Sequence, residues 1–286
     1  MKTHLQKAQA SQETDRRRIL NTIALHNDLE AVPPDEHSNY QDLNNTLASY
    51  FAVAGWTRLL AAGYDMEACG SKLRASSLKK IDISFALAQA SDLKLDALFL
   101  SLPESLQTLY LDLCLNVEPG RLLSLFTNLP TALRHLRLYM NGVPFLDDDI
   151  RVLGQGLPTG LVECQLGLAY CTEITDAGLV ALATHTPPSV RWLNLDCWGQ
   201  GKVTNEGFCS FVNALPASIQ TLDLRFVGTE IGDEGLDALI AGLPAGLSDF
   251  DAMLPEGKCT EEGVSRLKRA LTEKGVTIHC LDLASP

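Results

Sequence analysis

Histidine and cysteine are the side chains of this chain that could act as general bases, nucleophiles or metal ligands. The sequence holds six histidines and eight cysteines among 286 residues. The cysteines form no C-x-x-C pair, and no set of cysteines and histidines has the spacing of a zinc site. We therefore expect buried free thiols, with no metal and no cofactor. Cys164 falls on an apolar strand position and Cys209 on an expected helix.

One pair of residues has the types that acid–base catalysis needs. His135 is expected to stand beside Glu163 on the neighbouring strand, as a general-base pair would. Such neighbours are common on a highly charged surface, so we expect no enzyme activity. The stretch Gly199-Gln200-Gly201-Lys202 lacks the further glycine and the hydroxyl residue of a phosphate-binding loop, and we interpret it as an ordinary loop.

These side chains belong to a unit that recurs along the chain. Each copy has an LxxLxL stretch, whose alternation predicts a strand with one buried face. A helix with apolar residues three and four apart follows. The first apolar residue of the pattern returns every 27 to 31 residues, at Leu78, Leu106, Leu133, Leu161, Val190, Ile219, Leu247 and Ile278. A unit that cannot bury its own apolar face is stable only when stacked on its copies.

Two further marks recur with the same period. A Leu-Pro or Pro-Pro pair precedes most strands and predicts the end of each helix, because proline cannot continue a helix. The helix starts read Thr-Asp-Ala-Gly, Thr-Asn-Glu-Gly, Gly-Asp-Glu-Gly and Thr-Glu-Glu-Gly. Thr175, Thr204 and Thr260 are predicted to cap these helices, and the acidic residues after them suit the positive helix end.

Over residues 77–286 the pattern resembles the leucine-rich repeat family, and its period near 28 is similar to the ribonuclease-inhibitor-like subclass. The resemblance implies an α/β solenoid, or horseshoe, with a parallel concave sheet and outer helices. The chain departs from the family at the turn position that usually holds Asn or Cys, where only Cys114 and Asn141 match. We therefore expect the other turns to use different partners.

The chain divides into two parts. Residues 1–76 are expected to form a helical N-terminal segment that caps the first repeat, and residues 77–286 an array of about eight repeats. No apolar stretch has the length of a signal peptide or approaches a membrane span. We expect a cytoplasmic protein, with the nucleus as the alternative.

The net charge is uneven. It is −12 in total, with 8 basic and 9 acidic residues in 1–76 but 15 basic and 26 acidic residues in 77–286. Such a charge argues against nucleic acid or an anionic membrane as the main partner.

The outward positions of the strands are expected to form three columns across the concave face. The first column is Lys80, Thr108, His135, Glu163, Trp192, Thr221, Asp249 and Cys280. The second is Asp82, Tyr110, Arg137, Gln165, Asn194, Asp223, Asp251 and Asp282. The third is Ser84, Asp112, Tyr139, Gly167, Asp196, Arg225 and Met253.

This strip carries eight acidic and three basic residues, together with Tyr110, Tyr139 and Trp192, which we expect to project without internal partners. Aromatic anchors within a charged rim are typical of an interface. The sequence thus predicts a non-enzymatic module that binds a protein with a basic patch, and it leaves the oligomeric state open. The predicted partner-binding residues are Tyr110, Asp112, Arg137, Tyr139, Trp192, Asn194, Asp196, Asp223, Arg225 and Asp251.

Three alternatives remain at this point. Outward residues of this kind also keep an exposed sheet in solution without binding anything. Some members of the resembled subclass activate small GTPases, so a GTPase regulator is a second hypothesis. The third is a two-ended adaptor that uses residues 1–76 for one protein and the repeats for another.

Overall fold

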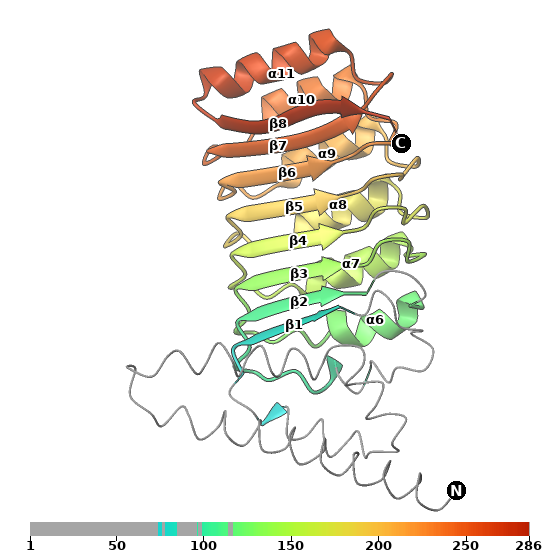
Figure 1. Cartoon of the computed structure of the whole chain (residues 1–286), viewed down its shortest axis with the longest axis vertical. Helices are drawn as coiled ribbons and strands as arrows, with labels where there is room; N and C mark the ends of the chain where they lie inside the picture. The colour runs from blue at the N-terminus through green and yellow to red at the C-terminus, as the bar shows by residue number, and fades with distance from the viewer. Residues whose placement is uncertain (1–73, 76–77, 85–95, 97–98, 114–116, 286) are drawn as a thin grey trace, which may run out of the picture.

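The computed structural model describes residues 74–75, 78–84, 96, 99–113 and 117–285. Nearly all of the expected N-terminal cap, residues 1–76, lies outside these ranges, and so does Cys114. Within the described residues, eight parallel strands form one sheet in chain order, and six helices lie on one face of it (Figure 1). The expected α/β solenoid is confirmed.

The elements alternate regularly along the array. The strands are β1 (Lys80–Ser84), β2 (Thr108–Asp112), β3 (His135–Tyr139), β4 (Glu163–Gly167), β5 (Trp192–Asp196), β6 (Thr221–Arg225), β7 (Asp249–Pro255) and β8 (Thr277–Ala284). The helices are α6 (Pro119–Phe126), α7 (Asp147–Gly156), α8 (Asp176–His185), α9 (Asn205–Ala214), α10 (Asp233–Gly242) and α11 (Glu261–Glu273). Each strand except β8 pairs with the next one along the chain, so the order of the strands in the sheet is their order in the sequence.

The core lies between the sheet and the helices. Along β6 the side chains alternate, with Leu222 and Leu224 fully buried and their neighbours half exposed. Aromatic side chains are also part of this core. The buried rings of Phe208, on α9, and Phe226, just after β6, meet edge to face with centroids 5.1 Å apart. Because every repeat buries residues against both neighbours, the array forms one continuous apolar core.

The predicted helix boundaries are confirmed. The hydroxyl oxygens of Thr175, Thr204 and Thr260 accept hydrogen bonds from backbone N–H groups in the first turns of α8, α9 and α11. Leu157 and Leu215 end α7 and α9 directly before a proline, as the Leu-Pro pairs predict.

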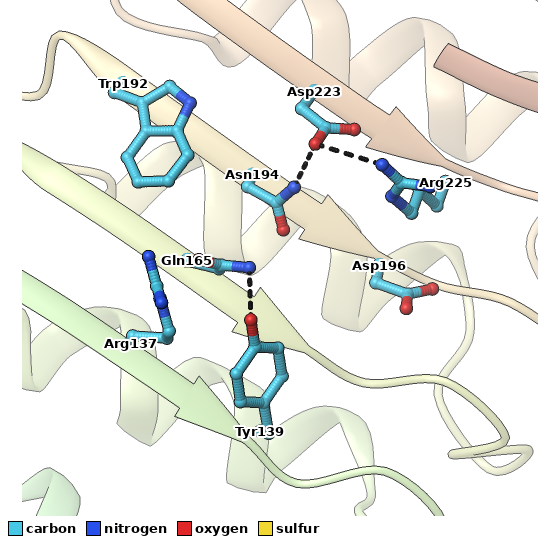
Figure 2. Close-up of a pocket in the computed structure, with 8 residues that line it drawn as sticks. All are labelled: Arg137, Tyr139, Gln165, Trp192, Asn194, Asp196, Asp223 and Arg225. Carbon is cyan, nitrogen blue, oxygen red and sulfur yellow. Dashed lines mark hydrogen bonds and ion pairs between the residues drawn. The ribbon is translucent and has the colours of Figure 1, made fainter. Parts of the chain in front are cut away.

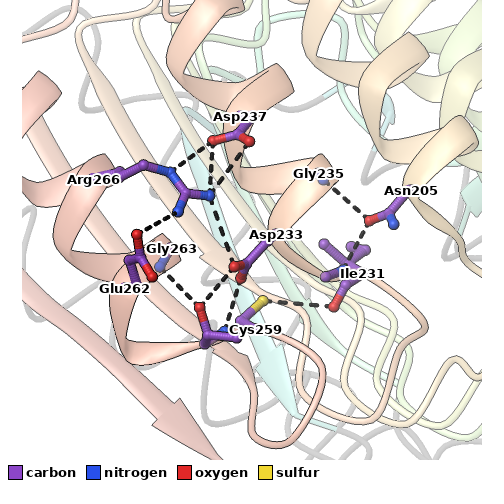
Figure 3. A network of polar contacts seen from close by, with 11 residues as sticks. Asn205, Ile231, Asp233, Gly235, Asp237, Cys259, Glu262, Gly263 and Arg266 are labelled. Carbon is purple, nitrogen blue, oxygen red and sulfur yellow. Dashed lines mark hydrogen bonds and ion pairs between the residues drawn. The ribbon is translucent and has the colours of Figure 1, made fainter.

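The repeats are also joined by a row of side chains at the helix starts, which we call the ladder: Asp147, Asp176, Asn205 and Asp233. Each member caps the helix of the next repeat rather than its own. The carboxylate of Asp176 accepts hydrogen bonds from the N–H and the hydroxyl of Thr204, both at 2.7 Å. Asp233 binds Thr260 in the same way, at 2.8 and 2.7 Å. Figure 3 shows Asn205 and Asp233 in these positions.

The ladder explains the glycine that recurs three residues after each capping position. A methyl group added at Gly207 would lie 2.1 Å from Oδ1 of Asp176, and one at Gly263 would lie 2.3 Å from Oδ1 of Asp233. Any larger residue would displace the carboxylate that caps the helix. The glycine of the Thr-x-x-Gly motif is therefore required by the preceding repeat.

The one asparagine of the ladder matches a change in its partner. Asn205 Oδ1 accepts hydrogen bonds from the N–H groups of Gly232 and Gly235, at 2.8 and 3.1 Å. Gly232 stands where α8, α9 and α11 have a threonine cap, and it brings no hydroxyl. A carboxylate has a second oxygen for the threonine hydroxyl, whereas the single oxygen of the amide serves the backbone N–H groups alone, so Asp faces Thr and Asn faces Gly.

The last strand departs from the expected register. A β-bulge between Phe250 and Asp251 places Asp249 beside Thr277 and Asp251 beside Cys280. The predicted placement of Cys280 in the first column and Asp282 in the second is wrong, because the bulge inserts one extra residue into β8. Asp282 instead lies beside Met253 in the third column.

The turns after the strands use several kinds of partner, as expected. Asn141 Oδ1 accepts a hydrogen bond from the N–H of Ala169 at 3.0 Å, which links two repeats. The backbone pairing continues both beside this asparagine and where it is lost, with hydrogen bonds from Gly142 N–H to the Ala169 carbonyl at 2.8 Å and from Gly199 N–H to the Val227 carbonyl at 2.7 Å. None of the helices in the described part of the chain is long and apolar enough to cross a membrane.

Candidate functional site

The three predicted columns are confirmed from β1 to β7. Strand register places Arg137, Gln165 and Asn194 side by side, with Asp223 and Asp251 next in the same row. These side chains stand on the face of the sheet opposite the helices. We call the three columns, with Thr277, Cys280 and Asp282 at the β8 end, the concave strip.

A hollow of about 450 Å³ lies in the middle of the strip, over β3 to β6. Seven of its eight lining residues are among the predicted partner-binding residues, and the eighth is Gln165, which belonged to the second column but was not selected. The lining consists of Arg137, Tyr139, Gln165, Trp192, Asn194, Asp196, Asp223 and Arg225 (Figure 2). Tyr110, Asp112 and Asp251 lie on the strip but outside this hollow.

A glycine in the third column sets the position of the Tyr139 ring at the hollow. Gly167 lies beside Tyr139 in the third column, and a methyl group there would come 2.7 Å from Cδ1 of the tyrosine ring. The ring of Tyr139 therefore leans across Gly167, and its hydroxyl oxygen accepts a hydrogen bond from Gln165 Nε2 at 2.7 Å. The single glycine of the third column is the sequence signal from which this arrangement of Tyr139 could have been predicted.

Asp223 is the most connected side chain of the hollow. Its Oδ2 accepts a hydrogen bond from the carboxamide of Asn194 and contacts Nη2 of Arg225 at 3.4 Å (Figure 2). The Arg225 guanidinium also approaches the sulfur of Met253 at 3.1 Å. Asn194 is only 6% exposed, so this network is held in place by the sheet itself.

Two carboxyl groups at this end of the strip have raised pKa values. Burial is the main cause of the raised pKa of Asp196, whose Oδ1 accepts a hydrogen bond from the Trp198 N–H at 3.0 Å. Burial also raises the pKa of Asp251, and the neighbouring Asp223 carboxylate adds to it. The surroundings of both groups therefore disfavour the ionised carboxylate.

Both tyrosines of the strip, Tyr110 and Tyr139, contact other side chains of the protein, which corrects the expectation that they project without internal partners. The Tyr110 ring lies between two cations, with Arg137 Cζ 4.5 Å and Lys80 Nζ 5.1 Å from its centroid. Tyr139 is held by Gln165, as described above. Trp192 is half-buried at the edge of the hollow. Tyr110, Arg137 and Lys80 form a stack that spans β1 to β3.

The strip is electrically uneven along the solenoid axis. On β1 to β3, Lys80 and Arg137 balance Asp82 and Asp112. On β5 to β8 one guanidinium, that of Arg225, faces five carboxylates: Asp196, Asp223, Asp249, Asp251 and Asp282. The negative field is therefore concentrated in the C-terminal half of the strip.

The predicted His135–Glu163 pair forms, with Nδ1 and Oε2 2.9 Å apart. Both side chains are 37% exposed, so the pair stands in solvent rather than in a cleft that excludes water. A second pair joins His279 to Asp249, again at 2.9 Å. The surroundings of both pairs are those of a charged surface.

The described cysteines are free thiols. Cys164, Cys171, Cys197 and Cys259 are buried, and Cys209 lies half-buried on α9. Burial raises the pKa of Cys164 to about 12, so this thiol stays protonated and is a poor nucleophile. No group of three or more His, Cys, Asp or Glu side chains in the described ranges is arranged to hold a metal ion.

Comparison with known proteins supports the fold. No protein-family model and no curated protein sequence matches this chain. Among solved structures, the leucine-rich repeat-containing protein LegL7 from Legionella pneumophila has a TM-score of 0.50 and 16% identity, over 74% of this chain and 69% of that one. This resemblance shows the leucine-rich repeat fold.

Two further structures align less well. The Rad7 and Elc1 complex in yeast has a TM-score of 0.45 and 14% identity, over 93% of this chain and 82% of that one. The tropomodulin C-terminal domain of Caenorhabditis elegans has a TM-score of 0.35 and 14% identity, over 73% and 93%.

Proposed function

We propose that this protein is a non-enzymatic interaction module whose concave strip binds a protein with a basic patch. The observation that carries the proposal is the C-terminal half of the strip, where five carboxylates face one guanidinium beside a hollow with aromatic walls. A field of one sign attracts partners of the opposite sign and speeds their association. The strip extends about 34 Å across eight strands, which is ample for a protein partner.

Several finer assignments accompany this proposal. The 28-residue spacing and the helix in each repeat support the ribonuclease-inhibitor-like subclass. A cytoplasmic or nuclear location suits a basic protein partner, and the negative strip disfavours nucleic acid and anionic membranes. The GTPase-regulator and adaptor hypotheses remain alternatives, and the experiment below separates the adaptor from a module that binds through the strip.

The experiment uses the full chain as bait and variants that change charge without changing shape. Asp223→Asn combined with Asp251→Asn removes two carboxylates from the strip. Glu273→Gln removes one from the exposed end of α11, where no described residue pairs with it. Asp237, an acidic residue on the neighbouring helix α10, is a poorer control because its Oδ1 accepts a hydrogen bond from Arg266 Nε at 3.1 Å.

Substitutions of the acidic residues and of Trp192 should weaken binding in different ways. The Asp223→Asn and Asp251→Asn pair should slow association with the captured partner and weaken its dependence on salt. Trp192→Ala should mainly speed dissociation, by a hot-spot amount of about 2 kcal/mol. The measurement is the association and dissociation rate at two salt concentrations.

The control decides the outcome. Glu273→Gln should leave both rates unchanged. Equal losses in the control and the strip variants would place the partner elsewhere. Capture that is indifferent to every strip variant would favour an adaptor that holds its partner through residues 1–76.

A further inference from the structure

The hollow contains oxygen atoms that lack hydrogen-bond donors. Gln165 Oε1 and Asp223 Oδ1 are buried and have no partner among the described residues. Asn194 donates to Asp223 through its nitrogen, which turns its oxygen toward the space enclosed by Gln165, Tyr139 and Asp196 (Figure 2). Asp196 uses Oδ1 for the Trp198 N–H, and its Oδ2 has no donor in the described part of the chain. The two buried acceptors without donors, Gln165 Oε1 and Asp223 Oδ1, cost free energy, which a ligand with N–H groups would recover.

The two arginines of the hollow do not donate hydrogen bonds to these unpaired oxygens. Arg225 is already engaged by Asp223 and Met253. Arg137 stands at the far end of the hollow from Asp196 (Figure 2), with its guanidinium against the Tyr110 ring and its buried Nε without an acceptor among the described residues. Around the β5–β7 end, the carboxylates of Asp196, Asp223 and Asp251 outnumber the single guanidinium of Arg225 and leave a net charge of −2.

The shape of the hollow favours a flat, donor-rich cation. Trp192 and Tyr139 offer aromatic walls on opposite sides of the acceptor oxygens (Figure 2). A guanidinium is planar, carries five N–H donors and stacks on aromatic rings, whereas an ammonium is a compact and strongly hydrated charge with three donors. A volume of about 450 Å³ admits one long side chain together with water.

We propose that the hollow is a subsite for a single arginine side chain of the protein partner. Its guanidinium would bind the oxygens of Asp196, Asp223 and Asn194, and its stem would lie along Trp192. This inference rests on the proposed function, because it names the chemical group that the partner presents. It explains why a strip that is acidic overall has two of its three aromatic side chains, Tyr139 and Trp192, around one hollow.

The test is an NMR titration of the full chain with acetyl-arginine-amide. The side-chain amide signals of Asn194 and Gln165 and the indole signal of Trp192 report from inside the hollow, and Trp192→Phe identifies the latter among three tryptophans. We expect saturable shifts of these signals with a dissociation constant of about 1 mM, since one small ligand gains little affinity. Acetyl-citrulline-amide has the same shape without the charge and should bind at least tenfold more weakly. Acetyl-lysine-amide should fall between them.

Variants then locate the binding. Asp196→Asn should weaken arginine binding about tenfold, while Glu273→Gln should not change it. Thermal unfolding and the unperturbed backbone spectrum of each variant confirm that it is folded. Trp192→Phe keeps an aromatic wall and should retain most of the binding.

Three results would overturn the subsite. They are shifts confined to signals outside the hollow, equal binding of the citrulline analogue, or arginine binding that Asp196→Asn leaves intact. Suppose that one of these results is found and that partner capture still depends on Asp223 and Asp251. The proposed interaction module would then be retained, and the arginine subsite would be rejected. If capture is indifferent to the strip while arginine binds the hollow, the proposed function falls and the subsite stands as a small-ligand site.

Discussion

The acidic residues of the ladder and those of the concave strip differ in how their oxygens are used. In the ladder, both carboxylate oxygens of Asp176 accept hydrogen bonds from Thr204. On the strip, Asp223 and Asp251 each keep a buried oxygen with no donor among the described residues. The ladder carboxylates hold one repeat to the next, and those of the strip face a surface that is open to a partner.

The pKa values of Asp233 in the ladder and of Asp196 and Asp251 on the strip follow this difference, whereas hydrogen bonds from Ser248 and His279 lower the pKa of Asp249 on the strip. Hydrogen bonds from the hydroxyl and N–H of Thr260 lower the pKa of Asp233 in the ladder. Burial raises the pKa of Asp196 and of Asp251 on the strip. The same residue type thus stabilises the fold at one place and is retained at a cost to stability at another. Carboxylates kept against a cost to stability are candidates for a role outside folding.

The largest effect is expected from Gly207→Ala. The added methyl group would lie 2.1 Å from Oδ1 of Asp176, so the carboxylate must move and release Thr204. We expect a loss of about 2–4 kcal/mol in the free energy of unfolding, measured by urea denaturation. Gly120→Ala in α6 is the matched control, because nothing lies within 4 Å of that position, and it should be neutral or stabilising. Equal effects at the two glycines would contradict the packing role of the ladder.

Removing a ladder carboxylate should cost somewhat less. Asp176→Ala leaves the N–H and hydroxyl of Thr204 without an acceptor, and we expect a loss of about 1–3 kcal/mol. Asp251→Asn on the strip keeps the shape and removes a charge that burial disfavours, so its free energy of unfolding should stay the same or rise. The comparison fails if the strip variant is the more damaging of the two.

A double-mutant cycle tests the pairing of Asp with Thr and of Asn with Gly. Asp176→Asn and Thr204→Gly each break the pair, and together they rebuild the chemistry of Asn205 and Gly232. We expect the double variant to lose less free energy of unfolding than the sum of the two single losses, with a coupling of about 0.5–1.5 kcal/mol. Additive losses would mean that the match is incidental.

The smallest effect concerns pH and should have opposite signs in the two regions. The folded-state pKa of Asp196 lies above its ordinary value of 3.8, so its ionised form destabilises the fold above that folded pKa. Asp196→Asn should therefore raise the melting temperature slightly at neutral pH, and the gain should vanish below about pH 4.

The ladder provides the reverse case. The pKa of Asp233 is lowered, so its ionised form stabilises the fold above the ordinary value of 3.8, and this stability is lost as the pH falls through the folded pKa. Asp233→Asn should lower the melting temperature at neutral pH, and the loss should shrink in acid. Melting curves from pH 2 to 7 for both variants would show it, and curves that shift in the same direction would refute the contrast.

The sequence alone determined the repeat, the strands and helices of the described array, the threonine caps and the columns in which the strand residues of β1 to β7 lie. It could do so because these features depend on periodicity: side chains alternate along a strand, and equivalent positions of stacked repeats share a column. Periodicity places all eight residues around the hollow in the three columns, and seven of them are among the predicted partner-binding residues.

Only the tertiary structure decided how those side chains meet. Tyr139 leans over Gly167 to reach Gln165, Arg225 turns to Asp223, and Arg137 stacks on Tyr110. The bulge in β8 and the contacts of the ladder from one repeat to the next also appear only there. Periodicity fixes the face on which a side chain lies, but its rotamer depends on the space and partners that neighbouring repeats leave, and this depends on packing in three dimensions.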